Sequence, residues 1–245
     1  MRSGRRVRAA AFAAAAFVCC IGVSSVSAQE ADDEARYILF SGRDIWRNGF
    51  FAYGGLVVAP GGLDQDGFLL KLLISGGLYR YNAGSLGGER VIGSEVTVQV
   101  LPGFRVKRGD LETKVFFGPD VEQHRLSPDD PSNNLRGRAF GIRFNFDIWY
   151  NPTPTTMLAG DATLSSVATN QSARLAFGWR VIDDQFYFGP EIAGFTSDGY
   201  RHLRLGFHVT GLKNDNYEWS AAGGWARDSE GRSSPYLRLG LMQRL

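Results

Sequence analysis

Apolar and polar residues alternate along much of this chain, and the clearest stretch runs from Arg136 to Tyr150. One row of the stretch is apolar and consists of Phe140, Ile142, Phe144, Phe146, Ile148 and Tyr150. The intervening row is mostly polar and consists of Gly141, Arg143, Asn145, Asp147 and Trp149. Because successive side chains point to opposite faces only in an extended chain, the stretch predicts a β-strand with one apolar and one polar face.

The same period of two recurs along most of the chain and predicts about twelve strands of roughly ten to fifteen residues. Strong further examples begin at Val96, Val115, Leu175, Phe186, Leu203 and Leu237, and weaker ones fit Tyr37–Gly42, Phe50–Val58, Phe68–Tyr79, Thr156–Val167 and Tyr217–Ala226. The longest connections are the third, fifth and eleventh, Asn82–Gly88, Ser127–Leu135 and Asp228–Ser234. They fall at one end of an up-and-down sheet, and we expect the even-numbered connections to be short. No shift in composition marks a domain boundary, so residues 29–245 are predicted to form one β-barrel domain.

Alternation does not say which face is inside, because a soluble sandwich or barrel would bury the apolar row and a membrane barrel would expose it. Three features favour an antiparallel transmembrane β-barrel. The predicted strands are longer than those of most soluble sheets. The polar rows mix charges of both signs with Gly and Ala, as a packed or wet lumen requires. Aromatic residues such as Phe104, Tyr150, Trp179 and Phe186 lie near strand ends, where they suit membrane interfaces.

The N-terminus has the pattern of a secretory signal that ends near Ala28. Four arginines precede an apolar run from Ala9 to Ile21, and small residues follow it. The run is too short for a transmembrane helix. Removal of residues 1–28 would take away four arginines and both cysteines, changing the formal charge from +2 to −2. The remaining chain has no basic excess, which argues against nucleic acid as a partner.

A barrel of this kind places its polar rows in the lumen. The predicted lumen-facing polar residues are Glu95, Arg105, Glu112, Lys114, Glu122, His124, Arg143, Asp147, Arg174, Glu191, Arg204 and His208. We expect Arg143 and Asp147 to pair with opposite charges on adjacent strands. Aromatic side chains offer stacking faces to sugar rings, and the candidates are Trp46, Trp149, Trp219 and Trp225, with Tyr79, Tyr81 and Tyr217 beside them.

Two arrangements carry catalytic or metal-binding potential but are weak in this sequence. Asp120, Glu122 and His124 share one face of a strand, and two carboxylates with an imidazole are able to bind a metal or move protons. One histidine without a second cluster makes a poor metal site, so ion pairing in the lumen is the preferred interpretation. Ser165 or Ser172 as the nucleophile of a hydrolase has no supporting spacing. We therefore predict no catalytic residue, no metal and no cofactor.

Many short segments resemble the alphaproteobacterial family of cellulose biosynthesis protein BcsS. In the first half they are Ser41–Gly49, Tyr53–Leu56, Gly62–Asp64, Leu70–Leu73, Ser75–Gly77, Tyr79–Tyr81, Leu101–Gly103, Lys107–Gly109, Lys114–Gly118, His124–Leu126 and Pro128–Pro131. In the second half they are Leu135–Gly137, Trp149–Tyr150, Pro152–Pro154, Gly178–Arg180, Gly189–Glu191, Ser197–Tyr200 and Glu218–Ala222. The resemblance covers nearly the whole chain after the signal.

The resemblance implies a secreted component of cellulose production in the outer membrane. Together with the signal and the alternation, it predicts a non-enzymatic outer-membrane barrel that assists the export or surface assembly of cellulose. Its implied partners are outer-membrane lipid, cellulose and other components of cellulose synthesis. Two alternatives stay open at this point. One is a soluble periplasmic β-sandwich or barrel that binds glucan, and the other is a barrel enzyme that acts on lipid or polysaccharide.

Overall fold

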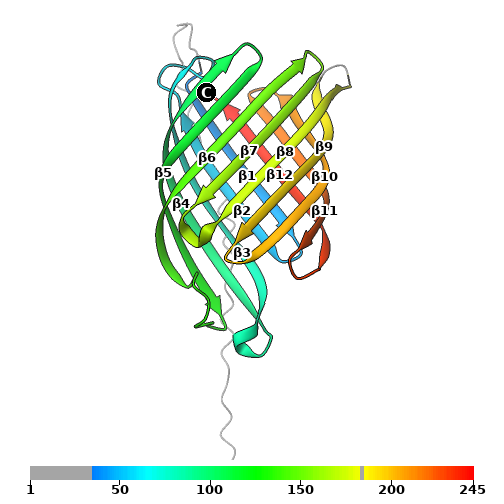
Figure 1. Ribbon diagram of the computed structural model, residues 1–245. Helices are drawn as coiled ribbons and strands as arrows, with labels where there is room; N and C mark the ends of the chain where they lie inside the picture. The colour runs from blue at the N-terminus through cyan, green and yellow to red at the C-terminus, as the bar shows by residue number, and fades with distance from the viewer. Residues whose placement is uncertain (1–34, 183–184) are drawn as a thin grey trace, which may run out of the picture. The chain divides into compact units, whose positions relative to one another are not determined.

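The computed structural model describes residues 35–182 and 185–245, and the predicted signal at residues 1–28 lies outside this part of the chain. The described residues form a closed antiparallel barrel of twelve strands, drawn in Figure 1. The strands are β1 (Tyr37–Trp46), β2 (Gly49–Val58), β3 (Gly67–Ala83), β4 (Glu89–Arg108), β5 (Leu111–Ser127), β6 (Gly137–Thr153), β7 (Thr156–Ser165), β8 (Gln171–Val181), β9 (Phe186–Ser197), β10 (Tyr200–Asn214), β11 (Tyr217–Asp228) and β12 (Ser233–Arg244). The predicted fold class and strand number are confirmed.

Each strand pairs with its neighbours in sequence, and β12 pairs with β1 to close the sheet. That last ladder runs from Ile38 opposite Arg244 to Trp46 opposite Tyr236. The Leu245 carbonyl accepts hydrogen bonds from the backbone N–H groups of Arg36 and Tyr37, at 2.8 and 2.9 Å, which continues the ladder past the strand ends. Closure gives each of the twelve strands a hydrogen-bonded neighbour on both sides, as a bilayer requires of a spanning sheet.

The barrel has two unlike ends. The terminal end holds Ala35, Leu245 and the even-numbered connections, whereas the loop end holds the odd-numbered connections. Strands β3 to β6 have 17 to 20 residues, more than the ten to fifteen expected, and their two hairpins project at the loop end (Figure 1). Two short 3₁₀ turns, Gly84–Leu86 and Val167–Thr169, lie in loop-end connections. Among the described residues, no helix has the length and apolar character needed to span a membrane.

The expectation that every even-numbered connection is short is wrong for residues 59–66, which join β2 to β3 at the terminal end. This segment folds into the barrel mouth at that end. Ala59 is 1% exposed and Leu63 is 3% exposed, and the Leu63 N–H donates to the Ala35 carbonyl at 2.8 Å. The segment is long because it supplies side chains to the interior, a role that turn residues in the sequence did not reveal.

The apolar rows of the strands face outward. Exposed large apolar side chains occur on all twelve strands, and Phe140 at 73% exposure is the extreme case. Outward aromatic residues gather at the terminal end, where they are Tyr37, Phe68, Phe104, Tyr150, Trp179, Phe188, Tyr217 and Trp219. The outward positions of the described strands contain no Asp or Glu. A soluble barrel would have the reverse arrangement, so the outer surface suits lipid.

The interior is packed with apolar side chains at the terminal end. Val57, Ala59, Leu63, Leu69, Leu101 and Phe116 form one buried cluster, with Ile38 and Phe40 against it. Arg105, only 2% exposed, holds residues 59–66 in place, because its guanidinium donates to the carbonyls of Gly62 at 3.0 Å and Gln65 at 2.8 Å. Apolar packing therefore occupies the interior beside β2 to β5 at the terminal end, next to the inward polar residues Arg105, Glu112 and Lys114.

Candidate functional site

The interior opens into a cavity of about 460 Å³ at the loop end. All six odd-numbered connections or the strand ends beside them contribute to its lining, for example Asn48, Ser85, Asn133, Asn170, Asp198 and Ser229. Deeper in the lumen lies a second space of about 290 Å³, which shares Trp46, Phe51, Glu95 and Phe195 with the first. Because they share these lining residues, the two spaces form one pocket that begins at the loop end.

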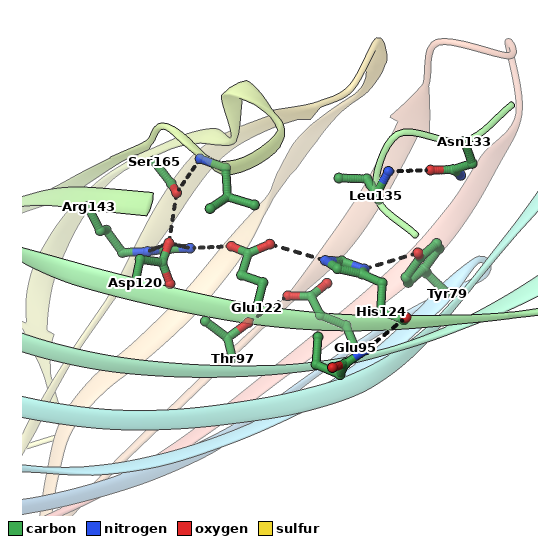
Figure 2. A network of polar contacts seen from close by, with 12 residues as sticks. Tyr79, Glu95, Thr97, Asp120, Glu122, His124, Asn133, Leu135, Arg143 and Ser165 are labelled. Carbon is green, nitrogen blue, oxygen red and sulfur yellow. Dashed lines mark hydrogen bonds and ion pairs between the residues drawn. The ribbon is translucent and has the colours of Figure 1, made fainter. Parts of the chain in front are cut away.

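One wall of this pocket carries a chain of buried charges and hydrogen bonds, shown in Figure 2. Arg143 on β6 donates to Asp120 on β5 at 2.9 Å and to Glu122 at 2.9 Å. Glu122 is 3.1 Å from the Nε2 atom of His124, whose Nδ1 atom lies 3.2 Å from the hydroxyl of Tyr79 on β3. The Ser165 hydroxyl on β7 donates to Asp120 at 2.7 Å. Period-two alternation puts these groups on the inner face, and strand pairing brings them together.

The charges in this network compensate one another. Side-chain exposure is 0% for Asp120, 2% for Glu122 and 10% for Arg143. Isolated charges at such burial would be very costly, whereas a guanidinium that bridges two carboxylates meets most of their hydrogen-bonding needs. The network therefore fixes the mutual position of β5, β6 and β7 and provides an ordered polar wall for the pocket.

Carboxylate oxygens of Glu95 and Glu122 and a ring nitrogen of His124 lie within 4.8 Å of one another, so we tested whether they suit a metal ion. Both ring nitrogens of His124 already face partners inside the protein. Glu95 accepts from the Thr97 hydroxyl at 2.9 Å, and Glu122 is bound by the Arg143 guanidinium. A cation would compete with these bonds and with the nearby positive charge, so the donor set fits an ion-pair network better than a metal centre.

A second group of charges lies across the lumen. Glu191 on β9 interacts with Arg238 on β12, with Arg174 on β8 at 3.4 Å, and with the Tyr236 hydroxyl at 3.4 Å. Arg204 on β10 binds both carboxylate oxygens of Asp44 on β1, at 2.8 and 2.7 Å. Arg174 and Glu191 lie on adjacent strands, whereas the Glu191–Arg238 and Arg204–Asp44 pairs join strands that are not neighbours in the sheet and therefore cross the lumen.

The longest odd-numbered connection, residues 128–136, is attached to the β3–β4 hairpin through Asp130. This carboxylate accepts hydrogen bonds from the hydroxyls of Ser132 at 2.7 Å, Ser85 at 2.8 Å and Tyr81 at 2.9 Å. The hydrogen bonds from Ser132 and then Ser85 hold the pKa of Asp130 below its ordinary value. Asn133 donates to the Tyr81 hydroxyl at 2.8 Å, which gives the segment a second attachment.

The twelve predicted lumen residues all occupy inward positions of their strands. Buried among them are Arg105, Glu122, His124, Arg143, Glu191, Arg204 and His208, and partly buried are Glu95, Glu112, Lys114, Asp147 and Arg174. Arg143 has the opposite-charge partners on an adjacent strand that the sequence analysis expected. Lys114 pairs with Glu112 on its own strand at 2.5 Å, and no ion pair of Asp147 occurs among the described residues.

The four tryptophans proposed for sugar stacking separate into two pairs. Trp219 is 49% exposed and Trp225 is 57% exposed, and both lie on the outer face. Trp149 points inward near the terminal end and donates to Asn151 at 2.8 Å. Only Trp46 lines the loop-end pocket, where its ring stacks on Phe51 at 5.6 Å between centroids and Arg204 lies 4.8 Å from it.

The pocket also contains aromatic residues that were not selected for the site from the sequence. Phe51 and Phe195 point inward, although each lies in a stretch of apolar and small residues where the alternation is ambiguous. Tyr79 and Tyr81, which were named as accompanying candidates, stack on each other at 6.3 Å and line the same wall as Glu95 and His124. Aromatic faces beside carboxylates and amides are the usual chemistry of sugar recognition.

Comparisons with known proteins agree with this architecture. Residues 38–245 match the family model described as cellulose biosynthesis protein BcsS. A comparison with curated proteins gives no match.

Among solved structures, an outer membrane channel from Pseudomonas putida F1 has a TM-score of 0.53 and 13% identity, with 88% of this chain and 97% of that chain covered. The translocator domain of the autotransporter NalP from Neisseria meningitidis has a TM-score of 0.51 and 12% identity, with 88% and 90% covered. The β domain of the Bordetella autotransporter BrkA has a TM-score of 0.50 and 13% identity, with 87% and 100% covered. At these identities the likeness concerns the fold alone.

Proposed function

The chain belongs to the family of cellulose biosynthesis protein BcsS, and from this premise we propose that it is a non-enzymatic outer-membrane barrel that assists the surface assembly of the glucan. The observation that carries the proposal is the shape of the interior. The pocket opens at the loop end, whereas at the terminal end residues 59–66 and an apolar cluster occupy the interior beside β2 to β5. A barrel of this shape holds a glucan segment at one membrane face more readily than it conducts a chain across the membrane.

The proposed location rests on the outer surface and on the two ends. A closed barrel whose outer face is apolar, with aromatic residues near one edge, is stable when it spans a bilayer. Three connections at the terminal end have only two residues, at 109–110, 154–155 and 215–216, whereas the longest connection and the projecting hairpins lie at the loop end. Outer-membrane barrels direct short turns to the periplasm and long loops outward. The pocket would therefore face the cell exterior.

The proposed ligand is a short stretch of glucan. Its hydroxyl groups would meet the carboxylates and amides of the pocket, and its ring faces would meet Tyr79, Tyr81 or Trp46. The protein needs no catalytic group for this role, and Glu122 and His124 beside the pocket are held in the buried network. Export through the barrel is the second candidate, and it would require residues 59–66 and the apolar cluster to leave the lumen.

The deciding experiment is deletion of the gene in the native host, followed by localisation of the glucan. We expect glucan to cross the outer membrane but to adhere less to the cell surface. Glucan that accumulates beneath the outer membrane would instead make the barrel a conduit. Complementation with Tyr79→Ala or Tyr81→Ala should fail to restore adhesion, whereas Trp219→Ala, an outward aromatic, is the matched control and should restore it.

A second experiment examines the closed lumen in vitro. Purified barrel in liposomes should admit cello-oligosaccharides no faster than protein-free liposomes. Replacing Arg105 with Ala frees residues 59–66 and should increase the uptake. Rapid uptake through the unaltered protein would contradict the surface-assembly proposal and favour export.

A further inference from the structure

The charged side chains at outward positions of the described strands are all positive. The outward positions of the described strands hold no Asp or Glu. Arg108 ends β4 and pairs with Asp66, and seven further outward positions hold arginine. Six of the seven lie at the loop end, one each on β3, β4, β5, β6, β10 and β11, and are called the rim arginines: Arg80, Arg90, Arg125, Arg138, Arg201 and Arg227. The seventh, Arg43, lies on β1 one outward position before Ile45.

The rim arginines mark the border of the apolar surface. In five of the six strands the arginine is the next outward position after the last exposed large apolar side chain, which is Leu78, Ile92, Phe140, Leu203 or Trp225. Two residues of strand span about 6.6 Å, so each guanidinium lies where hydrocarbon gives way to headgroups. The terminal end has aromatic residues at the corresponding positions. The two membrane faces of the barrel are therefore chemically different.

The guanidinium groups of the rim arginines differ from the other arginines at this end in their surroundings. All six arginines are exposed, and among the described residues none of their side chains makes an ion pair or hydrogen bond. Arginines elsewhere in the chain behave differently, since Arg136 pairs with Asp129 and Arg232 pairs with Asp228 at the same end. A planar guanidinium without a carboxylate beside it is well suited to bind phosphate in a bidentate manner.

A hollow of about 830 Å³ lies beside two of the rim arginines, on the wall from β7 to β11. Its lining includes the small outward residues Ala162, Ala173 and Gly194, and Arg201 and Arg227 also line it. A Cβ atom built on Gly194 would meet nothing within 4 Å, so the wall is open there. The hollow thus combines an apolar depression in the lipid-facing wall with two unpaired guanidinium groups at the headgroup level.

We propose that this hollow and its two arginines bind a phosphorylated, multiply acylated lipid of the surrounding leaflet, with acyl chain in the hollow and phosphate on Arg201 and Arg227. The other rim arginines extend the preference for anionic headgroups around the barrel. The inference rests on the proposed membrane location and not on the proposed handling of glucan. It also explains why the outward positions 162, 173 and 194 carry small residues between the exposed side chains of Leu164 and Leu203.

The test uses the mature barrel in nanodiscs and native mass spectrometry of the lipid that stays bound, with diphosphoryl lipid A as the probe in a zwitterionic background. A surface arginine contributes about 1 kcal/mol to attraction of anionic lipid, so each replacement should weaken retention about fivefold. Arg201→Gln with Arg227→Gln should weaken it about thirtyfold. Arg36→Gln, an exposed arginine at the terminal end, is the control and should have no effect.

A second pair of variants examines the hollow. Gly194→Leu fills it from an open position and should reduce retention of lipid A, whereas Gly54→Leu adds the same side chain on the outward face of β2 and should not. Equal retention of dephosphorylated lipid A, displacement of lipid A by inorganic phosphate alone, or the same loss in the Arg36→Gln control would overturn the proposal. Insertion of the unaltered protein into purely zwitterionic vesicles reports the membrane location separately.

Discussion

Replacement of Arg143 by Met tests the physical account of the lumen most directly. The substitution keeps a long side chain but leaves the carboxylates of Asp120 and Glu122, at 0% and 2% exposure, without their guanidinium. Removing one partner from a buried ion pair costs about 3–5 kcal/mol, and here two carboxylates lose their partner, so we expect a loss near the upper figure. Loss of the hydrogen bond from Ser165 alone, in Ser165→Ala, should cost about 1 kcal/mol.

The measurement is the free energy of unfolding in urea, with the barrel refolded into lipid vesicles and followed by tryptophan fluorescence and by heat-dependent mobility on a gel. Arg136→Met is the matched control, because Arg136 pairs with Asp129 at 48% and 62% exposure and should lose at most about 1 kcal/mol. Adding Asp120→Asn and Glu122→Gln to Arg143→Met should recover part of the loss, since the unpaired charges disappear. Equal destabilisation by the two arginine variants, or no recovery in the triple variant, would mean that Arg143 does not compensate the two buried carboxylates.

Three further predictions concern packing and the pocket rim. Gly189→Ala should destabilise the barrel by about 1–3 kcal/mol, because its Cβ would lie 2.0 Å from the Phe177 carbonyl oxygen, whereas Gly194→Ala should be neutral; urea titrations compare the two. Leu63→Ala should cost about 2–5 kcal/mol and increase proteolysis of residues 59–66. Asp130 has a lowered pKa, so its stabilisation of residues 128–136 is fully present above about pH 4 and lost as pH falls through its folded pKa. The protection of this segment from hydrogen exchange, relative to an unfolded peptide at the same pH, should fall there, and less in Asp130→Asn.

Much of the fold could be predicted because a barrel wall has a strict period of two. The rows at Arg136–Tyr150 show this well, since Phe140 and Ile142 are exposed outside while Arg143 and Asn145 are buried inside. Once one face of a strand is assigned, every residue on it is assigned as well. This assignment by the period of two is enough to predict the number of strands, their order and the inward position of the twelve polar candidates.

The site was less predictable because it depends on contacts between strands far apart in sequence. Asp44 and Arg204 meet across 160 residues, and Asp120 meets Ser165 only because β5, β6 and β7 are adjacent at one level. Phe51 and Phe195 were missed because their neighbours are apolar or small, which removes the alternation that indicates direction. The shear of the sheet decides which inward residues lie at the same height along the barrel axis. A single sequence contains no direct measure of that shear.

The sequence alone specified a sheet whose strands have one apolar face and one polar, charged face. It could do so because the alternation of apolar and polar residues is local and recurs in most strands. Only the tertiary structure decided that apolar side chains and residues 59–66 close the interior at the terminal end, that Arg143 unites two carboxylates, and that the outward arginines gather at one rim. These properties arise when strand register and closure bring distant residues to one level, where burial and charge compensation act between them.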